Sequence, residues 1–94
     1  MSKRNIHAVG ISSYLAGVEL MTCRVKAGSA AEGSVLRDGL VRGKSGATIL
    51  AIKRSEEVIS NPEPAMELQT EDVVVLLGNA RQLSVASTLF DSLA

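Results

Sequence analysis

Short apolar runs bounded by turn residues fill the middle and the second half of the chain. Residues 49–52 (ILAI) and 73–77 (VVVLL) are unbroken apolar runs, and a two-residue apolar step lies between them at residues 58–59. Runs of this length, rich in β-branched side chains, predict strands that are covered on both faces. The charged reversal at residues 54–57 and the turn at residues 61–64 separate the runs. Three strands with tight connections predict one sheet.

Weaker patterns predict the remaining elements. Residues 18–26 alternate loosely and predict a first strand. Ser34 is a suitable N-cap for a short helix over residues 35–41. Asn79, with Gln82 three residues later, has the spacing of a capping box and predicts a second helix. Its apolar residues recur at helical spacing at Leu83, Ala86, Leu89, Phe90 and Leu93.

These elements predict an α+β fold. Their order is β-α-β-β-β-α, which gives a small two-layer domain with a mainly antiparallel sheet covered by helices. Residues 18–94 form this domain. Residues 1–17 contain Gly10 and Gly17, which weaken a helix. This segment is a linker, a short N-terminal helix, or a tail that orders on dimerisation, and the pattern leaves these three alternatives open.

Composition adds an expectation about assembly and location. The chain has 94 residues, enough for one domain, and 46% of them are hydrophobic. So small a domain buries a modest fraction of its surface, so a second copy is expected to cover apolar area and form a homodimer. The uncharged stretch between Arg4 and Glu19 is too short to span a membrane, and it lacks a convincing signal-cleavage site. With the single Cys23, these features predict a cytoplasmic protein.

Residues that could carry out chemistry are few and poorly placed. The Gly-Lys-Ser of residues 43–45 lacks the glycine spacing of a phosphate-binding loop and precedes a strand. His7 and Cys23 are too few for a metal site and have no supporting catalytic motif. Two aromatic residues in a chain of zero net charge argue against direct nucleic-acid binding. We therefore expect no catalytic residues, no metal and no cofactor.

The charge distribution indicates where an anion could bind. Residues 1–55 carry nine basic and three acidic residues, and residues 56–94 carry one basic and seven acidic. Arg42 and Lys44 flank Gly43 before the predicted strand, and the pair at residues 53–54 ends it. Glycines at this point favour close approach of backbone N–H groups to a ligand. The cluster predicts a phosphate site; the alternative is an ordinary basic surface.

Four segments occur in an order typical of one known family. They are Gly28-Ser29 followed by Gly33 and Leu36, residues 46–54 (GATILAIKR), residues 58–62 (VISNP), and Leu68 followed by residues 72–78 (DVVVLLG). The set, which spans about residues 18–90, resembles the C-terminal regulatory domain of TrkA/RCK proteins, which control potassium channels and cation transporters. The resemblance implies a dimeric domain without enzymatic activity, which associates with a membrane cation transporter, channel or cation/proton antiporter.

The resemblance also implies a ligand site. Some members bind cyclic di-AMP at or near the dimer interface, and others have no known ligand. The matching positions, together with the neighbouring Lys44, are Val41, Arg42, Gly43, Lys44, Thr48, Ile49 and Pro62. Two positions depart from the family pattern. Glu71 stands where glycine is usual, and Gly39 stands where leucine is usual, so we expect strain at the former and a looser short helix at the latter.

Three functions follow as hypotheses. The leading one is a ligand-sensing regulatory domain of a potassium or other monovalent cation transport protein. The second is a dimerisation or scaffold module without a ligand. The third is the effector domain of a transcription regulator.

Overall fold

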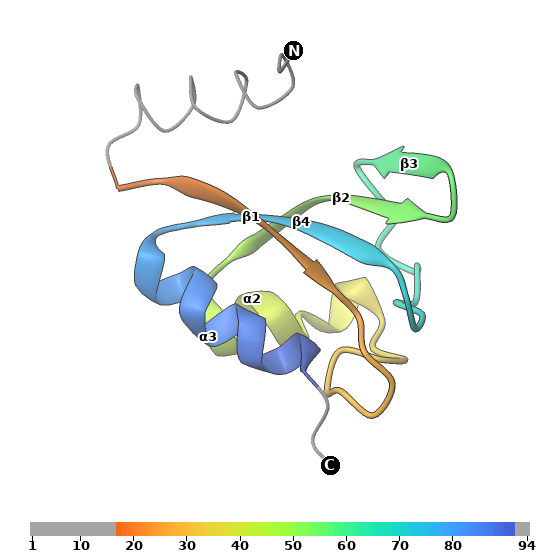
Figure 1. Ribbon diagram of the computed structural model, residues 1–94, viewed down its shortest axis with the longest axis horizontal. Helices are drawn as coiled ribbons and strands as arrows, with labels where there is room; N and C mark the ends of the chain where they lie inside the picture. Colours follow the sequence, from red (N-terminus) through yellow and green to blue (C-terminus); the bar gives the residue numbers. More distant parts are fainter. Residues whose placement is uncertain (1–16, 92–94) are drawn as a thin grey trace.

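Four antiparallel strands form one sheet in the computed structural model, which describes residues 17–91 (Figure 1). The strand order is β1-β4-β2-β3, so the last strand of the chain lies between the first two. The elements are β1 (Glu19–Arg24), η1 (Leu36–Asp38), α2 (Leu40–Ser45), β2 (Thr48–Arg54), β3 (Glu57–Ser60), β4 (Val73–Gly78) and α3 (Ala80–Phe90). The predicted α+β class, element order and sheet are confirmed.

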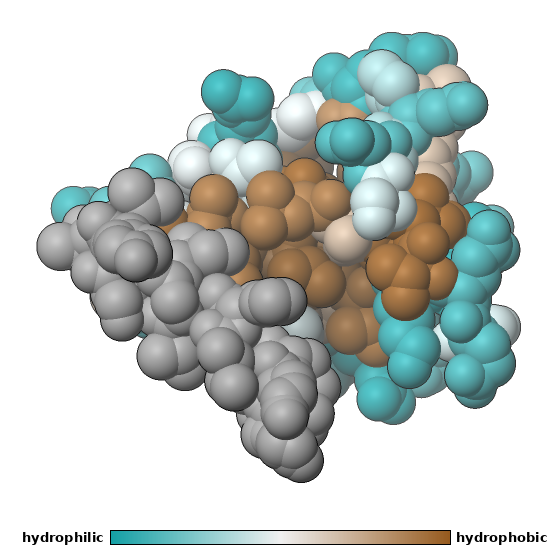
Figure 2. Space-filling view, turned by 90° about the horizontal axis from the view of Figure 1, so that it is seen from above, coloured by the Kyte–Doolittle hydropathy of each residue, from teal (hydrophilic) through white to brown (hydrophobic). Residues whose placement is uncertain are grey.

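Both α-helices of residues 17–91 lie on the same side of the sheet (Figure 1). The core is the layer between these helices and the sheet. The strand β4, in the interior of the sheet, contributes Val74 and Leu76 to this core. The other buried apolar residues are Val25, Ala31, Val41, Ala47, Ile52, Leu68, Leu83, Ala86 and Phe90. Alternate residues of β4 are only half-buried. The described helices cover one face of the sheet, so cover of the second face, which carries a hydrophobic band (Figure 2), stays a prediction.

The capping box at the start of α3 is confirmed. The backbone N–H of Gln82 donates to Asn79 Oδ1 at 2.7 Å, and the backbone N–H of Asn79 donates to Gln82 Oε1 at 2.8 Å. The same Gln82 side chain lies against the end of α2, because a Cβ added to Gly46 would lie 2.8 Å from Gln82 Nε2. Gly46 also has a φ of 86°. Glycine at this position therefore allows α2 to end beside the start of α3.

The helix predicted over residues 35–41 is wrong. Residues 36–38 form a single 3-10 turn, Gly39 follows in the left-handed region with φ 69° and ψ 31°, and α2 begins only at Leu40. The hydroxyl of Ser34 donates to the carbonyl of Ala31 and caps no helix. The left-handed glycine is the physical reason, since a residue with positive φ ends one helical turn before the next begins. It follows that residues 42–45 are helical and do not form a loop.

Residues 1–16 and 92–94 lie outside the described part of the chain. The alternatives for the N-terminal segment and the position of Leu93 in the predicted helix lie there.

The strain expected at Glu71 has a structural basis, because its φ is 78°. A non-glycine residue in the left-handed region costs about 1–2 kcal/mol. Glu71→Gly removes that cost. It also raises the conformational entropy of the unfolded chain, and it removes the exposed contact of Glu71 Oε1 with Arg24 Nη1 at 3.3 Å, and both of these effects are destabilising. We expect the variant to be more stable by about 0.5–1 kcal/mol, which raises Tm by a few degrees.

Thermal unfolding followed by circular dichroism measures this difference. Glu71→Gln is the matched control, since it removes the ion pair and keeps a side chain at positive φ. A glycine variant no more stable than the glutamine variant contradicts the assignment of strain to this residue.

Candidate ligand pocket

A cavity of about 230 Å³ opens between α2, the start of β2 and the segment that follows β3. Its lining residues come from four parts of the chain: Ser34, Val35, Leu36, Gly39, Leu40, Val41, Arg42, Ala47, Thr48, Ile49, Asn61, Pro62 and Leu68. Of these, Val41, Ala47 and Leu68 belong to the buried core. The cavity therefore rests on a rigid apolar base.

Backbone hydrogen bonds hold two of the cavity walls together. The N–H of Leu68 donates to the carbonyl of Ser34 at 2.9 Å, and the N–H of Leu36 donates to the carbonyl of Met66 at 2.9 Å. The N–H of Gly33 donates to Leu68 in the same ladder, at 2.8 Å. Residues 33–36 and 66–68 thus pair like short strands, although neither lies in the main sheet. The pairing fixes the position of the Ser34–Leu36 wall.

The sequence-derived candidates divide into two groups. The structure brings Val41, Arg42, Thr48, Ile49 and Pro62 together as lining residues of the cavity. Gly43 and Lys44 lie on α2, are exposed and do not line it. Of the described residues that do line it, Arg42 alone carries a charge. The lining is thus largely apolar, with one cation and with polar side chains at Ser34, Thr48 and Asn61.

The expected backbone site for an anion at the glycines is wrong. The N–H of Gly43 donates to the carbonyl of Gly39 at 2.7 Å, and the N–H of Gly46 donates to the carbonyl of Arg42 at 2.8 Å. Both donors are used inside and at the end of α2, because residues 42–45 are helical. They are therefore not free to bind a phosphate. The Arg42 side chain is the remaining anion-binding group of the cavity.

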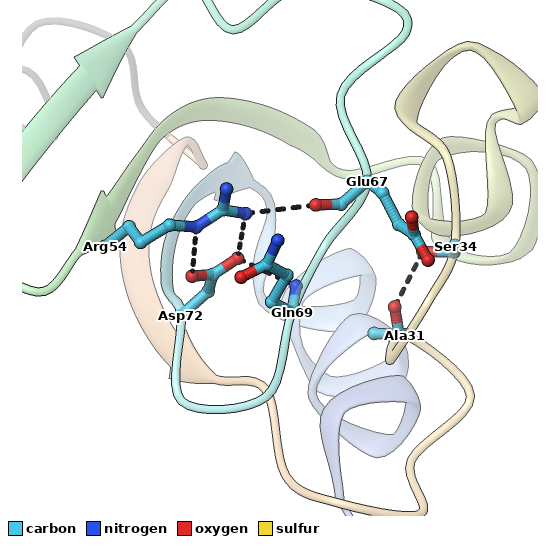
Figure 3. A network of polar contacts seen from close by, with 6 residues as sticks. All are labelled: Ala31, Ser34, Arg54, Glu67, Gln69 and Asp72. Atoms are coloured by element: carbon cyan, nitrogen blue, oxygen red, sulfur yellow. Dashed lines mark hydrogen bonds and ion pairs between the residues drawn. The ribbon is translucent and has the colours of Figure 1, made fainter.

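The predicted basic cluster is also divided by the fold. Lys53 pairs with Val73 across the sheet and lies on the face away from the helices, so it is remote from Arg42. The Arg54 side chain instead points to Asp72, as Figure 3 shows. Its Nε donates to Asp72 Oδ1 at 2.9 Å and its Nη2 to Asp72 Oδ2 at 2.7 Å. Arg54 is therefore a structural residue, and its assignment to a phosphate site is wrong.

This ion pair joins the sheet to the loop behind the cavity. Arg54 Nη2 also donates to the carbonyl of Glu67 at 3.0 Å, and the backbone N–H of Gln69 donates to Asp72 Oδ2 at 2.9 Å (Figure 3). The Asp72 side chain is 2% exposed. Burial raises its pKa, but the hydrogen bonds from Arg54 and Gln69 outweigh burial and hold the pKa below its ordinary value. The carboxylate is thus ionised at neutral pH.

Cys23 has no feature of a reactive thiol. It is half-buried and packs against the core beside β4. Burial, with a smaller contribution from the negative charge of Asp91, raises the pKa of the thiol, which disfavours the thiolate. Within residues 17–91, no cluster of three or more histidine, cysteine, aspartate or glutamate side chains could hold a metal ion.

Eight lining residues were not among the candidates from the sequence: Ser34, Val35, Leu36, Gly39, Leu40, Ala47, Asn61 and Leu68. Ser34 and Gly39 were assigned to a helix and its cap, and Asn61 was assigned only to a turn. Asn61 has a φ of 49°, the left-handed conformation that asparagine adopts more readily than most residues. The dipeptide Asn61-Pro62 is a turn signal, but a turn signal does not indicate which cavity the turn borders.

The fold and the cavity together define a small α+β domain with an apolar pocket and one cation at its edge. Within that class the chain belongs to the TrkA-C domain family, whose profile matches residues 20–91. This family is a regulatory domain of potassium transport proteins and is not a catalytic fold. No described helix is long and apolar enough to cross a membrane.

Curated relatives are proteins of potassium transport. The chain is 41% identical over 54 residues to "Probable potassium channel protein 2" of Methanocaldococcus jannaschii, which covers 57% of this chain. It is 32% identical over 88 residues to "Ktr system potassium uptake protein C" of Bacillus subtilis, which covers 89% of this chain. The chain spans 16% and 40% of the lengths of these relatives, respectively.

Solved structures of similar fold include complexes with a nucleotide and with DNA. The RCK_C domain dimer of S. agalactiae BusR in complex with c-di-AMP has a TM-score of 0.70 at 23% identity, over 80% of this chain and 93% of that one. The KtrA RCK C domain in complex with c-di-AMP has a TM-score of 0.69 at 21% identity, over 89% and 93%. BusR with its busAB-promotor DNA has a TM-score of 0.69 at 18% identity, over 93% and 44%. At these identities the likeness shows the fold.

The DNA complex bears on one earlier expectation. This chain matches 44% of the BusR chain in that complex. Our expectation that this chain itself contacts no nucleic acid therefore stays a prediction.

Proposed function

We propose that this chain is a cytosolic regulatory domain of a potassium or other monovalent cation transport protein, and that it binds an anionic nucleotide, cyclic di-AMP, between two copies. The observation that carries the proposal is the cavity in which Arg42 lies beside the apolar side chains of Val41, Ile49 and Pro62. A guanidinium binds phosphate oxygens, and an apolar lining suits a nucleobase. The relatives within potassium channel and uptake proteins supply the biological setting.

The size of the cavity supports a ligand shared by two copies. Its volume of about 230 Å³ is below the range of about 300–1,000 Å³ that is usual for small-molecule sites. A two-fold symmetric interface places the same patch of each copy on either side of the axis. Two facing cavities then offer about twice the volume and two arginines. A two-fold symmetric ligand with two phosphates matches that arrangement. The structures of the similar domains of BusR and KtrA were determined in complex with c-di-AMP.

Such a ligand acts by stabilising one arrangement of the two copies over another. Binding shifts an equilibrium only as far as the affinities for the two arrangements differ. A change in the orientation of the two copies is the signal that the attached membrane channel, transporter or antiporter subunit receives. In this proposal the domain performs no chemistry and lies at the cytosolic face of the membrane.

Ligand-induced thermal stabilisation tests the proposal. Cyclic di-AMP at 100 times its dissociation constant is expected to add about 2.7 kcal/mol to the free energy of unfolding. Arg42→Ala should abolish most of the resulting Tm shift, because it removes the one charged side chain of the cavity lining. Lys44→Ala is the matched control, since Lys44 lies two residues away on α2, is exposed, and should leave the shift unchanged.

The comparison extends to cyclic di-GMP and ATP, which distinguish a nucleotide site in general from a site for two adenines. A chain with no Tm shift for any of the three, or an Arg42→Ala variant with an undiminished shift, refutes the ligand proposal. A stable dimer without any shift would leave a dimerisation or scaffold module.

A second candidate function is the effector domain of a transcription regulator. BusR, whose RCK_C domain has a similar fold, is also found in complex with promoter DNA. In that setting the ligand site is the same, but the attached segment binds DNA and no membrane protein is involved. The sequence that adjoins this domain in the native reading frame separates the two: membrane-spanning segments support the transport function, and a helix-turn-helix segment supports the regulator.

A further inference from the structure

The two residues that flank Leu68 in the chain are both bonded to one ion pair. Arg54 Nη2 donates to the carbonyl of Glu67 at 3.0 Å, and the N–H of Gln69 donates to Asp72 Oδ2 at 2.9 Å (Figure 3). The N–H of Asp72 also donates to the carbonyl of Gln69 at 3.1 Å. Leu68 is therefore fixed from both sides by the last residue of β2 and by the residue that precedes β4.

Leu68 connects this ion pair to the cavity. Its side chain is 1% exposed and lines the cavity. Its N–H donates to the carbonyl of Ser34, and its own carbonyl accepts from the N–H of Gly33. Residues 33–36 and 66–68 thus form one wall of the cavity, and a displacement of Leu68 displaces the strand-like segment that is paired with it.

The exposed side-chain contacts of the same loop are weaker. The hydroxyl of Thr70 donates to Glu32 Oε2, and the N–H of Gly28 donates to Glu32 Oε1, but both contacts are exposed to water. Water replaces the partners of an exposed hydrogen bond at little cost. The carboxylate of Asp72 is 2% exposed and accepts two parallel hydrogen bonds from Arg54, which is the stronger arrangement. The pair therefore determines where the wall lies.

We propose that Arg54 is a positioning residue for the ligand cavity: together with Asp72 it holds the wall closed, and without it the wall opens locally while the sheet stays folded. Strand β2 then fixes two sides of the cavity, because Thr48 and Ile49 at its start line the cavity directly. A ligand that needs the closed wall binds with an affinity reduced by the closed fraction. This effect on affinity rests on the proposed function, whereas the closure of the wall does not.

Hydrogen exchange of single amides, measured by NMR without ligand, tests the closure. The N–H groups of Leu68 and Leu36 bond across the wall and report on its opening. The amides of β4 report on global unfolding, because β4 is paired on both edges. Arg54→Ala should accelerate exchange at both wall amides about tenfold or more. Val74→Ala is the matched control, since Val74 is 0% exposed in the core and is not among the lining residues.

The control separates local opening from a general loss of stability. Val74→Ala should accelerate exchange in β4 but change the wall amides by less than about twofold. Wall amides that accelerate equally in Arg54→Ala and Val74→Ala show that the wall opens only with the whole domain, and this overturns the proposal. Wall amides that Arg54→Ala leaves unchanged overturn it too. Arg54→Lys, a milder change, should give an intermediate acceleration, and it replaces Arg54→Ala if circular dichroism shows that the alanine variant is unfolded.

Calorimetric titration with cyclic di-AMP tests the effect on the ligand. At about 15 °C, near the temperature at which small domains are most stable, the folded variants are compared directly. Arg54→Ala should raise Kd about threefold or more, and Val74→Ala should leave Kd at the parent value. If Arg54 only stabilises the fold, both variants lower Tm and neither changes Kd, and this result overturns the proposal. A parent chain that does not bind cyclic di-AMP refutes the ligand proposal instead, and the exchange experiment then decides on the wall alone.

Discussion

Arg54→Ala is expected to lower the free energy of unfolding by about 3 kcal/mol, which corresponds to a fall in Tm on the order of 15 °C. The guanidinium makes two hydrogen bonds to the buried carboxylate of Asp72, and a third to the carbonyl of Glu67. Removing it leaves a buried negative charge with only the N–H of Gln69 as partner. This loss is at the lower end of the range for breaking a buried ion pair. The reason is that the Arg54 side chain is 31% exposed, so water can partly replace the guanidinium as a partner of Asp72.

Three control variants show whether the effect comes from the pair. Lys53→Ala removes a neighbouring exposed cation and should change stability by less than about 0.5 kcal/mol. Arg54→Lys keeps the charge but loses the two parallel hydrogen bonds, and should recover about half of the loss. In the double variant Arg54→Ala/Asp72→Ala the losses should be less than additive, with a coupling of about 2 kcal/mol. Additive losses contradict a direct interaction.

The pair also predicts how stability depends on pH. The pKa of Asp72 is lower in the folded chain than in the unfolded chain. The unfolded chain therefore binds the proton more readily, and stability falls as pH falls from the unfolded pKa of about 4 through the folded value. The stabilisation is fully present above that window. We expect the difference between the parent chain and Arg54→Ala to shrink in urea titrations below about pH 4; a difference that is constant from pH 7 to pH 3 contradicts this.

Local signals in the sequence predicted most of the regular structure. The apolar runs predicted β2 and β4 because β-branched residues in short runs have few alternatives to a buried strand. Asn79 and Gln82 predicted the start of α3 because both halves of a capping box are formed by residues three apart. These signals depend on neighbours along the chain, so they can be read without the fold.

The candidate site could be predicted only in part, because it depends on contacts between distant segments. Gly39 adopts a positive φ and divides the predicted helix, where the sequence analysis expected only a looser helix. Arg54 was grouped with Arg42 because both are basic and near one strand, but its partner Asp72 is eighteen residues away. Only the structure shows which of two cations is already paired.

The Arg54–Asp72 ion pair is linked to the shape of the cavity. Arg54 holds the carbonyl of Glu67, and the adjoining Leu68 lines the cavity and donates its N–H to Ser34. The Arg54–Asp72 pair therefore positions one wall of the proposed ligand site without contacting a ligand. Conversely, a ligand in the cavity should stabilise this wall, so the Tm shift with cyclic di-AMP reports on the same segment.

Phe90→Ala is expected to lower the free energy of unfolding by about 4 kcal/mol. Phe90 is the one phenylalanine of the chain, is 1% exposed, and is among its largest fully buried side chains. It lies in the last turn of α3, and its carbonyl accepts a hydrogen bond of 3.2 Å from the N–H of Lys26. The carbonyl of Leu89 likewise accepts one of 2.9 Å from the N–H of Ala31. The ring thus anchors both the helix and the loop that leads to the cavity wall.

The cost arises because an alanine leaves a cavity that rigid strands cannot close. Small domains have total stabilities near the lower end of about 5–15 kcal/mol, so a loss of this size leaves a substantial unfolded fraction at 37 °C. Urea unfolding followed by circular dichroism measures it. Phe90→Leu should lose less, because most of the apolar volume remains, and Val85→Ala on the same helix, where Val85 is 38% exposed, should lose less than about 1 kcal/mol. If Phe90→Ala is no less stable than Val85→Ala, the end of α3 does not anchor the core, and the loop before the cavity is held by its backbone hydrogen bonds alone.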